Sequence, residues 1–584
     1  MKYFWAGCLL AGSMGSCSQP VEQQAHTAVR IRWTRDPENL SPLSLSNQNA
    51  VDAANLLYCS LLQADLATGT YAPALADSLP QIQLLGDSLT HLRYQLRSAA
   101  TWDDGRPVLA TDVAFTLKLI FCPGLPNEKV RSSLNFVRDI KFDTTNPRRF
   151  TLVCRGQAPE FRFESGDFPV LSEDALDPTH SLRRLSLARV VAASADASPI
   201  PALAALAERY QKADIGHHPE RLAGCGPYRL TAWETRRFLT FERKPHWWAD
   251  ALPAAPLVLQ AKPLQLRFSI IPDDATATLA LRRHEVDVLP QVSAREFKRL
   301  QASAAAQRDF AFYSTVSYEV VTAGFNTRRS ILRDSLTRQA ISKLFDPARL
   351  LQATQLGQGL RTVGLLHPTN DRRYYNISLP LPTYDLPQAQ VLLRRAGWLR
   401  QPTGWTRPAA NGQPEQLALA LCYRTEESTF KTIALQFKAA ATLLGIPVDL
   451  RPVEGSAMTT TLREGNFDMY VRIQKGNPFA FNYTAILHSR TANEGNFSKF
   501  GTPTTDRLIE AVDAATTPAQ KRQLLHRFQA MLQGQAPLVP LFFLPYRLVA
   551  DRHIQHLYPA AIKPGYSAPT ITWADKAAAA PVQQ

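Results

Sequence analysis

Two short groups of residues have the types and spacing that could support catalysis or metal binding. Asp103 and Asp104 could act as a carboxylate pair in acid–base chemistry, but a glycine and a proline follow shortly after them and favour a turn. His217 and His218 could hold a metal ion, but the proline that follows them favours a surface loop. We therefore predict neither a catalytic site nor a metal site at these positions.

The sequence also lacks the motifs of common hydrolases and nucleotide-binding enzymes. Gly-x-Ser-x-Gly, His-Glu-x-x-His and the Walker A lysine loop are all absent. The pair Trp247-Trp248 could stack on a ligand, but we favour packing in the core. We expect a protein that is not an enzyme and that uses no cofactor and no metal.

The composition is that of a soluble globular protein with several domains. The chain has 584 residues, of which 45% are hydrophobic and 20% are charged, and it is too long for a single core. The formal net charge is +15, with arginines spread along the chain rather than clustered. This distribution argues against a nucleic-acid partner. It favours a solvated basic surface, with attraction to an anionic membrane or an acidic ligand as the alternative.

The first residues have the pattern of a cleaved targeting segment. A single lysine precedes the apolar run Tyr3–Gly12, and two small residues then precede Cys17. This order resembles the lipobox of bacterial lipoproteins. The resemblance implies that residues 1–17 are a lipoprotein signal peptide, that Cys17 is lipidated and anchors the protein to a membrane, and that residues 18–27 are a polar tether.

The five later cysteines give no metal-binding or redox motif. They are Cys59, Cys122, Cys154, Cys225 and Cys422. We favour buried free thiols, and a disulfide between Cys122 and Cys154 is the alternative, because export from the cytoplasm would permit it.

Hydrophobic periodicity predicts alternating strands and helices. An apolar–polar alternation predicts a strand over 28–33. Near the C-terminal end, strands over 417–421, 446–450 and 467–471 accompany an amphipathic helix over 430–444. The order strand, helix, strand is typical of an α/β protein with parallel strand pairing.

Two helix starts carry capping signals. Ser293 with Glu296 has the spacing of a capping box, and Asp385 with Gln388 has a similar arrangement. We therefore predict that helices begin directly after Ser293 and Asp385.

One stretch of the chain carries a long signature. Residues 102–115 read Trp-Asp-Asp-Gly-Arg-Pro-Val-Leu-Ala-Thr-Asp-Val-Ala-Phe, which resembles Trp-x-Asp-Gly-x-Pro-x-x-Ala-x-Asp-Val-x-Phe of the large solute-binding proteins of peptide-type ABC transporters. Blocks at 224–248, 268–288, 324–346 and 384–398 follow in the order of that family. The chain thus resembles bacterial extracellular solute-binding protein family 5, the peptide, oligopeptide and nickel type, in its lipoprotein form.

The resemblance implies an α/β fold of the two-lobed periplasmic-binding-protein kind. This is the type II fold of the large cluster with an extra subdomain, in which mixed sheets are flanked by helices and a cleft lies between the lobes. The expected division is lobe I from 28–60, 173–262 and 525–575, subdomain Ib from 61–172, and lobe II from 263–524.

The cleft of this chain departs from that of peptide binders. In peptide binders of the family, an aspartate that follows the third late strand commonly takes the peptide amino group. The matching stretch 472–483 has no acid, and Lys475 lies in that neighbourhood, where it would attract carboxylate or phosphate. The residues that we expect to line the cleft are Lys475, Asn477, Phe479, Phe481, Tyr483, Arg472, Asn47, Gln48 and Asn49.

The resemblance implies a lipid-anchored monomer on the periplasmic side of the cell envelope. It would capture a peptide or a similar oligomeric solute and deliver it to an ABC permease in the membrane. The missing aspartate keeps a second function open, namely a binder or sensor of a non-peptide solute that is anionic or a glycan.

Overall fold

The computed structural model describes residues 28–574, except for residues 87, 197–199, 409–411, 477, 480 and 493. The predicted signal peptide, the lipidation residue Cys17 and the predicted tether over 18–27 lie outside the described residues. Within the described part, no helix is both long enough and apolar enough to cross a lipid bilayer.

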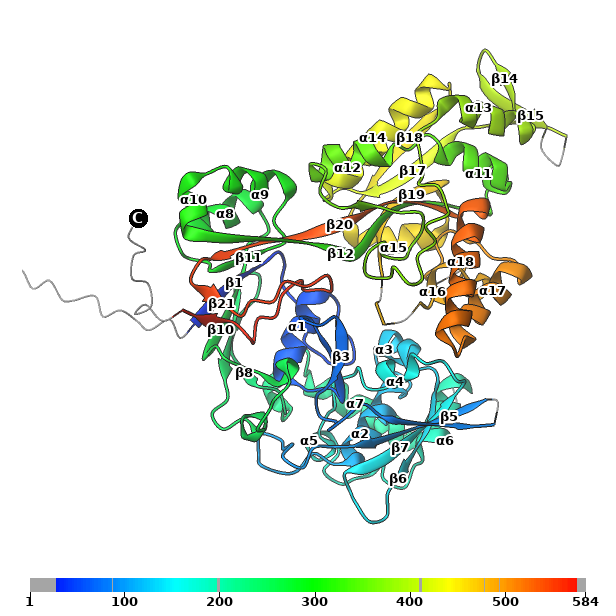
Figure 1. The fold of residues 1–584 in the computed structure, drawn as a ribbon. Coiled ribbons are helices and arrows are strands. Elements are labelled where there is room, and N and C mark those ends of the chain that lie inside the picture. The colour runs from blue at the N-terminus through cyan, green and yellow to red at the C-terminus, as the bar shows by residue number, and fades with distance from the viewer. Residues whose placement is uncertain are drawn as a thin grey trace, which may run out of the picture.

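A single sheet of 11 strands runs through the described part of the chain and is shared by two lobes (Figure 1). Its strands, in spatial order, are β18 (Val448–Val453), β17 (Leu419–Arg424), β19 (Met469–Lys475), β12 (Phe310–Phe325), β20 (Leu538–Asp551), β11 (Val288–Pro290), β1 (Ala28–Trp33), β10 (Gln265–Ile270), β9 (Phe238–Arg243) and β8 (Tyr228–Glu234), with β13 (Leu360–Arg361) also paired to β20. The predicted strands over 28–33, 417–421, 446–450 and 467–471 are therefore present, with ends shifted by a few residues.

The long strands β12 and β20 connect the lobes. They have 16 and 14 residues and pair antiparallel from Phe310↔Asp551 to Gly324↔Leu538. Between residues 28 and 574 the chain passes from one lobe to the other along β12 and returns along β20 (Figure 1). Their ladder shifts register between Val316 and Val320.

Lobe I is built on β8, β9, β10, β1 and β11. Strands β1 and β10 are parallel with Ile31 opposite Phe268, and the rings of Trp33 and Phe268 stack at 4.0 Å. Helices α8 (Asp274–Arg282), α9 (Ala294–Gln301) and α10 (Ala304–Asp309) join the small apolar cluster around Phe297 and Phe310. The structure thus places residues 263–309 in lobe I rather than in lobe II, where the sequence analysis put them, because β10 pairs with β1 and β9.

The subdomain has its own four-stranded sheet. The strands in spatial order are β4 (Gln81–Leu85), β5 (Leu89–Gln95), β7 (Arg149–Arg155) and β6 (Val137–Phe142), beside helix α2 (Ala110–Ile120). Segments after the predicted end at residue 172 also pack here, because Lys118 Nζ donates to the Leu182 carbonyl at 2.8 Å and Cys122 Sγ lies 3.5 Å from the Leu203 carbonyl. The subdomain therefore extends through α5 (Glu173–Leu176), α6 (Leu187–Asp196) and α7 (Pro201–Ala213).

Lobe II contains the parallel strands β17, β18 and β19, with helices on both faces. One face is covered by α11 (Ser335–Ser342), α12 (Pro347–Gln355), α13 (Leu386–Arg395) and α14 (Ser428–Leu443), and the other by α15 (Gly455–Glu464). Helices α17 (Pro503–Ala514) and α18 (Pro518–Gln535) form a further cluster with Val320 and Phe543 of the long strands. Residues 525–535 therefore pack in lobe II, although the sequence analysis placed them in lobe I.

The structure tests three local sequence predictions, namely two helix caps and one disulfide. Asp385 caps α13 by accepting a hydrogen bond from the Gln388 backbone N–H at 2.8 Å, as predicted. Ser293 does stand at the start of α9, but its side chain makes no capping hydrogen bond, so the predicted capping box is wrong. The five cysteines of the described part are buried free thiols, so the alternative of a Cys122–Cys154 disulfide is also wrong.

Candidate functional site

A cavity of about 460 Å³ lies between the two lobes. Lobe I contributes residues around the start of α1 (Gln48–Leu57), and lobe II contributes Arg424 at the end of β17 and Lys475 at the end of β19. Strands β17 and β19 run parallel. Their carboxyl ends therefore open at the same edge of the sheet, which is where open α/β sheets offer a crevice for a ligand.

Positive charge dominates this cavity. The cationic side chains in its walls are Arg35, Arg424, Arg472, Lys475 and Lys563. The acidic residues lining it are Glu319 and Glu427. Because Lys563 Nζ lies 2.7 Å from Glu319 Oε1, Glu319 is already neutralised. Cationic side chains outnumber carboxylates in the lining of the cavity, so the cavity attracts anionic groups.

The guanidinium of Arg472 lies against the ring of Phe497, at 5.0 Å from the ring centroid. Desolvation by burial lowers the pKa of Arg472 from its ordinary value. Within the described residues, no carboxylate lies within 4.0 Å of this guanidinium as an ion-pair partner. An incompletely solvated charge without a counter-ion is costly, and it gives the cavity a strong preference for an anion.

The lobe I wall is polar but held by internal hydrogen bonds. Gln48 Nε2 donates to Asp52 Oδ1 at 2.9 Å, and Asn49 Nδ2 donates to the Arg35 carbonyl at 2.6 Å. Burial raises the pKa of Asp52 to about 7, although the Gln48 hydrogen bond opposes the rise. This wall is therefore largely organised before any ligand arrives.

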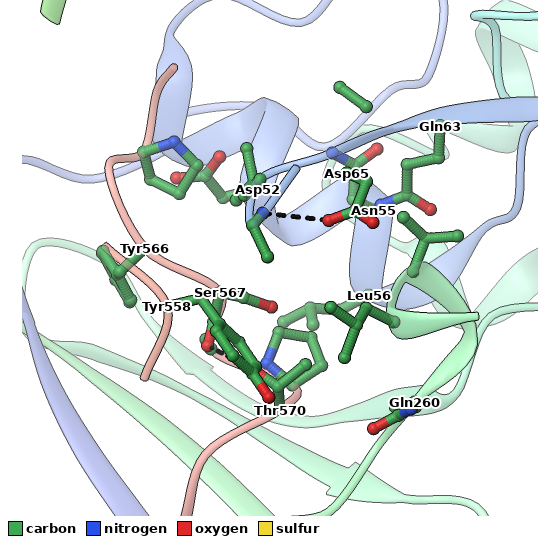
Figure 2. Close-up of a pocket in the computed structure, with 18 of the residues that line it drawn as sticks. Asp52, Asn55, Leu56, Gln63, Asp65, Gln260, Tyr558, Tyr566, Ser567 and Thr570 are labelled. Carbon is green, nitrogen blue, oxygen red and sulfur yellow. Dashed lines mark hydrogen bonds between the residues drawn. The ribbon is translucent and has the colours of Figure 1, made fainter. Parts of the chain in front are cut away.

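A second, smaller pocket shares Asp52 with that wall and is lined by lobe I and by the first residues of the subdomain (Figure 2). Its cavity volume is about 90 Å³, and Asp52, Asn55 and Asp65 face the C-terminal segment that carries Tyr558 and Tyr566. This volume suits a few water molecules rather than a solute. The cavity between the lobes is therefore the better candidate for a binding site.

Four of the residues predicted to line the cleft meet in the cavity between the lobes. They are Gln48 and Asn49 from lobe I, and Arg472 and Lys475 from lobe II. Asn477 lies outside the described residues. The prediction was useful where it followed the carboxyl end of a strand, because that end opens into the cavity.

Three predicted residues have other roles in the structure. Asn47 caps α1, because its Oδ1 accepts from the Ala50 N–H at 3.2 Å and its amide donates to backbone carbonyls. Phe481 packs edge-on against Tyr374, and Tyr483 is buried and stacked on Phe528 at 4.1 Å. Phe481 and Tyr483, which were predicted to line the cavity, instead join the core around α18.

Phe479, also predicted in the cleft, instead belongs to a contact between lobe II and the subdomain. Its ring lies 4.3 Å from that of Tyr71 on β3 (Thr70–Pro73). Nearby, Lys521 Nζ of α18 lies 2.6 Å from Glu160 Oε1 of the subdomain, with 6% and 15% of the two side chains exposed. We call these four residues, with Glu164 and Asp513, the subdomain contact.

The subdomain contact is rich in carboxylates. Burial, together with the neighbouring Glu160, Asp513 and Asp167, raises the pKa of Glu164 to about 7. Burial likewise raises the pKa of Asp513 to about 6, with a hydrogen bond from Thr484 opposing the rise. Lys521 offsets part of this negative charge at both carboxyls, and Arg490 does so at Asp513.

The groups first considered for chemistry have structural roles. Asp103 pairs with Lys244 at 2.5 Å, and Asp104 accepts hydrogen bonds from Arg106 across a turn. The indole N–H groups of Trp247 and Trp248 both donate to the Cys225 carbonyl, and both rings are buried. Among the described residues, no group of three or more His, Cys, Asp or Glu side chains could hold a metal ion.

Sequence reasoning missed several cavity residues. Arg424 is the last residue of β17 and Glu427 follows shortly after it, so their position at the carboxyl end of a strand was a usable signal. Arg35 follows β1 in the same way. Lys563 comes from the C-terminal segment, far along the chain, and no local pattern places it in the cavity.

Two α/β lobes joined by two long strands, with a charged cavity between them, define a two-lobed binding protein of the type II periplasmic class, and the predicted fold class is confirmed. The structure of NikA from Brucella suis in complex with Fe(III)-EDTA is similar, with a TM-score of 0.73 at 20% identity, covering 94% of this chain and 99% of that chain. The oligopeptide-binding protein AppA from Bacillus subtilis, in complex with a nonapeptide, has a TM-score of 0.72 at 16% identity, covering 94% and 99%.

The sequence narrows this class to a family. The profile of the bacterial extracellular solute-binding proteins, family 5 Middle, matches residues 70–495. The chain therefore belongs to family 5 of the bacterial extracellular solute-binding proteins, and the resemblance seen in the signature is confirmed. Its relatives include the probable di/tripeptide-binding protein 5 of Pseudomonas aeruginosa, which is 26% identical over 514 residues, covering 85% of this chain and 86% of the relative.

Proposed function

We propose that this protein is the substrate-binding component of an ABC transporter and that it delivers its solute to a membrane permease. It binds a peptide or a similar oligomeric solute in the cavity between the lobes, where Gln48, Asn49, Arg472 and Lys475 contact the solute. The observation that carries the proposal is this cavity of about 460 Å³, lined by residues of both lobes and by more cationic than anionic side chains. The names of its relatives, one a di/tripeptide-binding protein, support a peptide.

A non-peptide solute, either anionic or a glycan, is the second candidate, and the excess of positive charge in the cavity favours an anionic one. Glu427 is the carboxylate in the lining that Lys563 does not neutralise, so little negative charge is available for a peptide amino group. A Lys475→Asp variant separates the candidates. If the solute is a peptide whose amino end lies near this position, peptide affinity measured by calorimetry should rise, whereas affinity for an anionic solute should fall.

The identity of the solute is best tested by native mass spectrometry. The soluble form that begins at Ser18 would be purified from its own cells and sprayed intact. A ladder of bound masses that differ by amino-acid residues would support the peptide, and one discrete non-peptide mass would support the second candidate. Absence of any bound mass, together with no binding to a peptide library, would contradict the proposal.

We also propose that the mature protein acts as a monomer, anchored through lipid on Cys17 to a membrane on the periplasmic side of the cell envelope. The small residues before Cys17 and the apolar run before them support this. The test is detergent-phase partitioning of the full chain and of a Cys17→Ser variant expressed in the same cells. The wild type should enter the detergent phase and the variant should remain in the aqueous phase. Equal partitioning of both would refute the anchor.

A further inference from the structure

The four-stranded sheet of the subdomain has one buried face and one face turned to solvent (Figure 1). Buried and exposed side chains alternate along β5 and β7, as they do when one face of a sheet is covered. On the other face, Arg93 lies opposite Thr151, and Thr151 lies opposite Lys141 of β6. Arg155 lies opposite Leu89 and points the same way as Thr151. We call the side that carries Arg93, Lys141 and Arg155 the outer face of the subdomain sheet.

The cations of the outer face are not neutralised by the described chain. Arg93, Lys141 and Arg155 are exposed, and none of them forms an ion pair with a described carboxylate. Other arginines of the subdomain are paired, as Arg183 is with Glu173 at 2.9 Å. The outer face therefore carries positive charge that is available to a partner.

Little negative charge lies on the same face. Of the described strand residues that point this way, Asp139 is the one acid, and its Oδ1 accepts a hydrogen bond from the Ile140 backbone N–H at 2.9 Å. Desolvation by burial, together with the charges of Lys141 and Arg93, lowers the pKa of His91 from its ordinary value. These three side chains are thus close enough for their charges to interact.

Apolar side chains adjoin the cations at the β4–β5 hairpin. Leu85 and Leu89 lie opposite each other on the outer face, and Leu89, which also lies opposite Arg155, is 36% exposed. Leu84 of the edge strand β4 is 54% exposed. Exposed apolar side chains that lie together beside polar ones mark a surface that binds a partner.

We propose that the outer face of the subdomain sheet docks onto an anionic lipid membrane, with its cations at the phosphates of the headgroups and Leu89 in the interfacial layer. This inference goes beyond the proposed function, because it does not depend on the solute in the cavity. The cations are spread over three neighbouring strands, which are about 5 Å apart. Such a spacing matches a continuous layer of phosphates, to which each cation near the surface is attracted.

The test is co-sedimentation with lipid vesicles of the form that begins at Ser18. This form lacks Cys17, so any binding comes from the protein surface. We expect it to bind vesicles of phosphatidylcholine and phosphatidylglycerol in equal parts, but not vesicles of phosphatidylcholine alone. Salt at about 1 M shortens the Debye length to about 3 Å and should abolish the binding. Equal binding to both kinds of vesicle, or binding to neither, would overturn the proposal.

A pair of matched double variants tests the cations. Arg93→Gln with Arg155→Gln should weaken binding to the anionic vesicles about 25-fold, because each cation near such a surface contributes about fivefold. The control is Arg295→Gln with Lys298→Gln, which removes the same charge from exposed positions on α9 of lobe I. The control should bind like the wild type. Equal losses in the two double variants would assign the binding to net charge alone and would overturn the proposal.

A polarity-sensitive dye on a single thiol tests which surface meets the lipid. The form that begins at Ser18 contains five cysteines, and all five are buried, so a dye on Leu89→Cys reports from the outer face. Its emission should move to shorter wavelength when the anionic vesicles are added. The control is Leu443→Cys on α14 of lobe II, where Leu443 is 70% exposed, and its dye should not respond. The opposite pattern, or the same response at both positions, would overturn the proposal.

Discussion

Lobe II faces the rest of the described chain at two places that differ in charge and in ion pairing: the cavity shared with lobe I and the subdomain contact. The cavity between the lobes is cationic, and Arg472 there has no counter-ion in the described chain. The subdomain contact is acidic, and Lys521 Nζ forms an ion pair with Glu160 Oε1 at 2.6 Å. In the cavity, Arg472 lacks a carboxylate partner in the described chain, whereas in the subdomain contact Lys521 is paired with Glu160 of the same chain.

This difference indicates two roles: the cavity recognises the solute, and the subdomain contact holds lobe II against the subdomain. A site that must accept an external anion benefits from charge that the protein does not neutralise, even though such charge reduces stability. A contact that holds two parts of one chain together benefits from pairs and stacked rings that need nothing from outside. We therefore expect substitutions in the cavity to change affinity, and substitutions in the subdomain contact to change how readily lobe II rests on the subdomain.

The largest effect is expected from Lys521→Met. It leaves Glu160 nearly buried without its partner, which should disfavour the contact by about 3 kcal/mol. Small-angle X-ray scattering should report a larger radius of gyration than that of the wild type. The double variant Lys521→Met with Glu160→Gln should recover most of the compact form, because no unpaired charge is left. An unchanged radius in Lys521→Met would show that the contact does not hold the two parts together.

A smaller effect is expected from pH. Burial and neighbouring carboxylates raise the pKa of Glu164 to about 7 from its ordinary value of 4.5, so the contact is favoured while Glu164 is protonated. Its contribution is complete at pH below about 4.5 and is lost as the pH rises through about 7. Scattering should therefore show more compact protein at pH 5 than at pH 8, with a change of about tenfold in the equilibrium after solvent screening.

The matched control for this pH effect is Glu164→Gln. Other buried acids such as Asp52 and Asp371 also have raised pKa values, so the variant isolates the share of Glu164. The variant should remain compact at pH 8. A pH response identical to that of the wild type would assign the effect to other groups.

The smallest effect is expected from Phe479→Leu. The substitution removes a ring that lies 4.3 Å from Tyr71 but keeps an apolar side chain. Aromatic pairs contribute about 1 kcal/mol beyond their buried area, so the contact should weaken by about that amount. Scattering with and without solute should show a slightly higher solute concentration needed for compaction. A loss as large as that of Lys521→Met would mean that apolar packing, not the ion pair, dominates the contact.

The sequence was sufficient for the family, the fold class and the main strands of lobe II. The signature over 102–115 and the strand–helix–strand order after residue 417 depend on local patterns, which sequence carries directly. The boundaries between the lobes were harder to predict from the sequence. Residues 263–309 follow the same α/β pattern as lobe II, and only the pairing of β10 with β1, across more than 200 residues of sequence, assigns them to lobe I.

The candidate site was predictable only in part, for a related reason. Arg472 and Lys475 were found because they follow a predicted strand in a segment where the family resemblance implies a ligand contact, but Lys563 reaches the cavity from a distant segment. Phe481 and Tyr483 were misplaced because an apolar ring after a strand fits a core as well as a cleft. Whether such a ring packs in the core or lines the cleft depends on the direction of the chain after residue 476 and on the position of α18.

The two strands that join the lobes also determine how the lobes can move. Strands β12 and β20 are hydrogen-bonded to each other, so within residues 28–574 the lobes share a two-stranded ribbon rather than a pair of loose linkers. Two-stranded ribbons twist more than larger sheets do. We therefore expect the lobes to rotate relative to each other by twisting of this ribbon. Its softest point is the break in the ladder between Val316 and Val320, beside Glu319 in the cavity wall. A solute in the cavity would therefore lie beside the irregular part of the ribbon that joins the lobes.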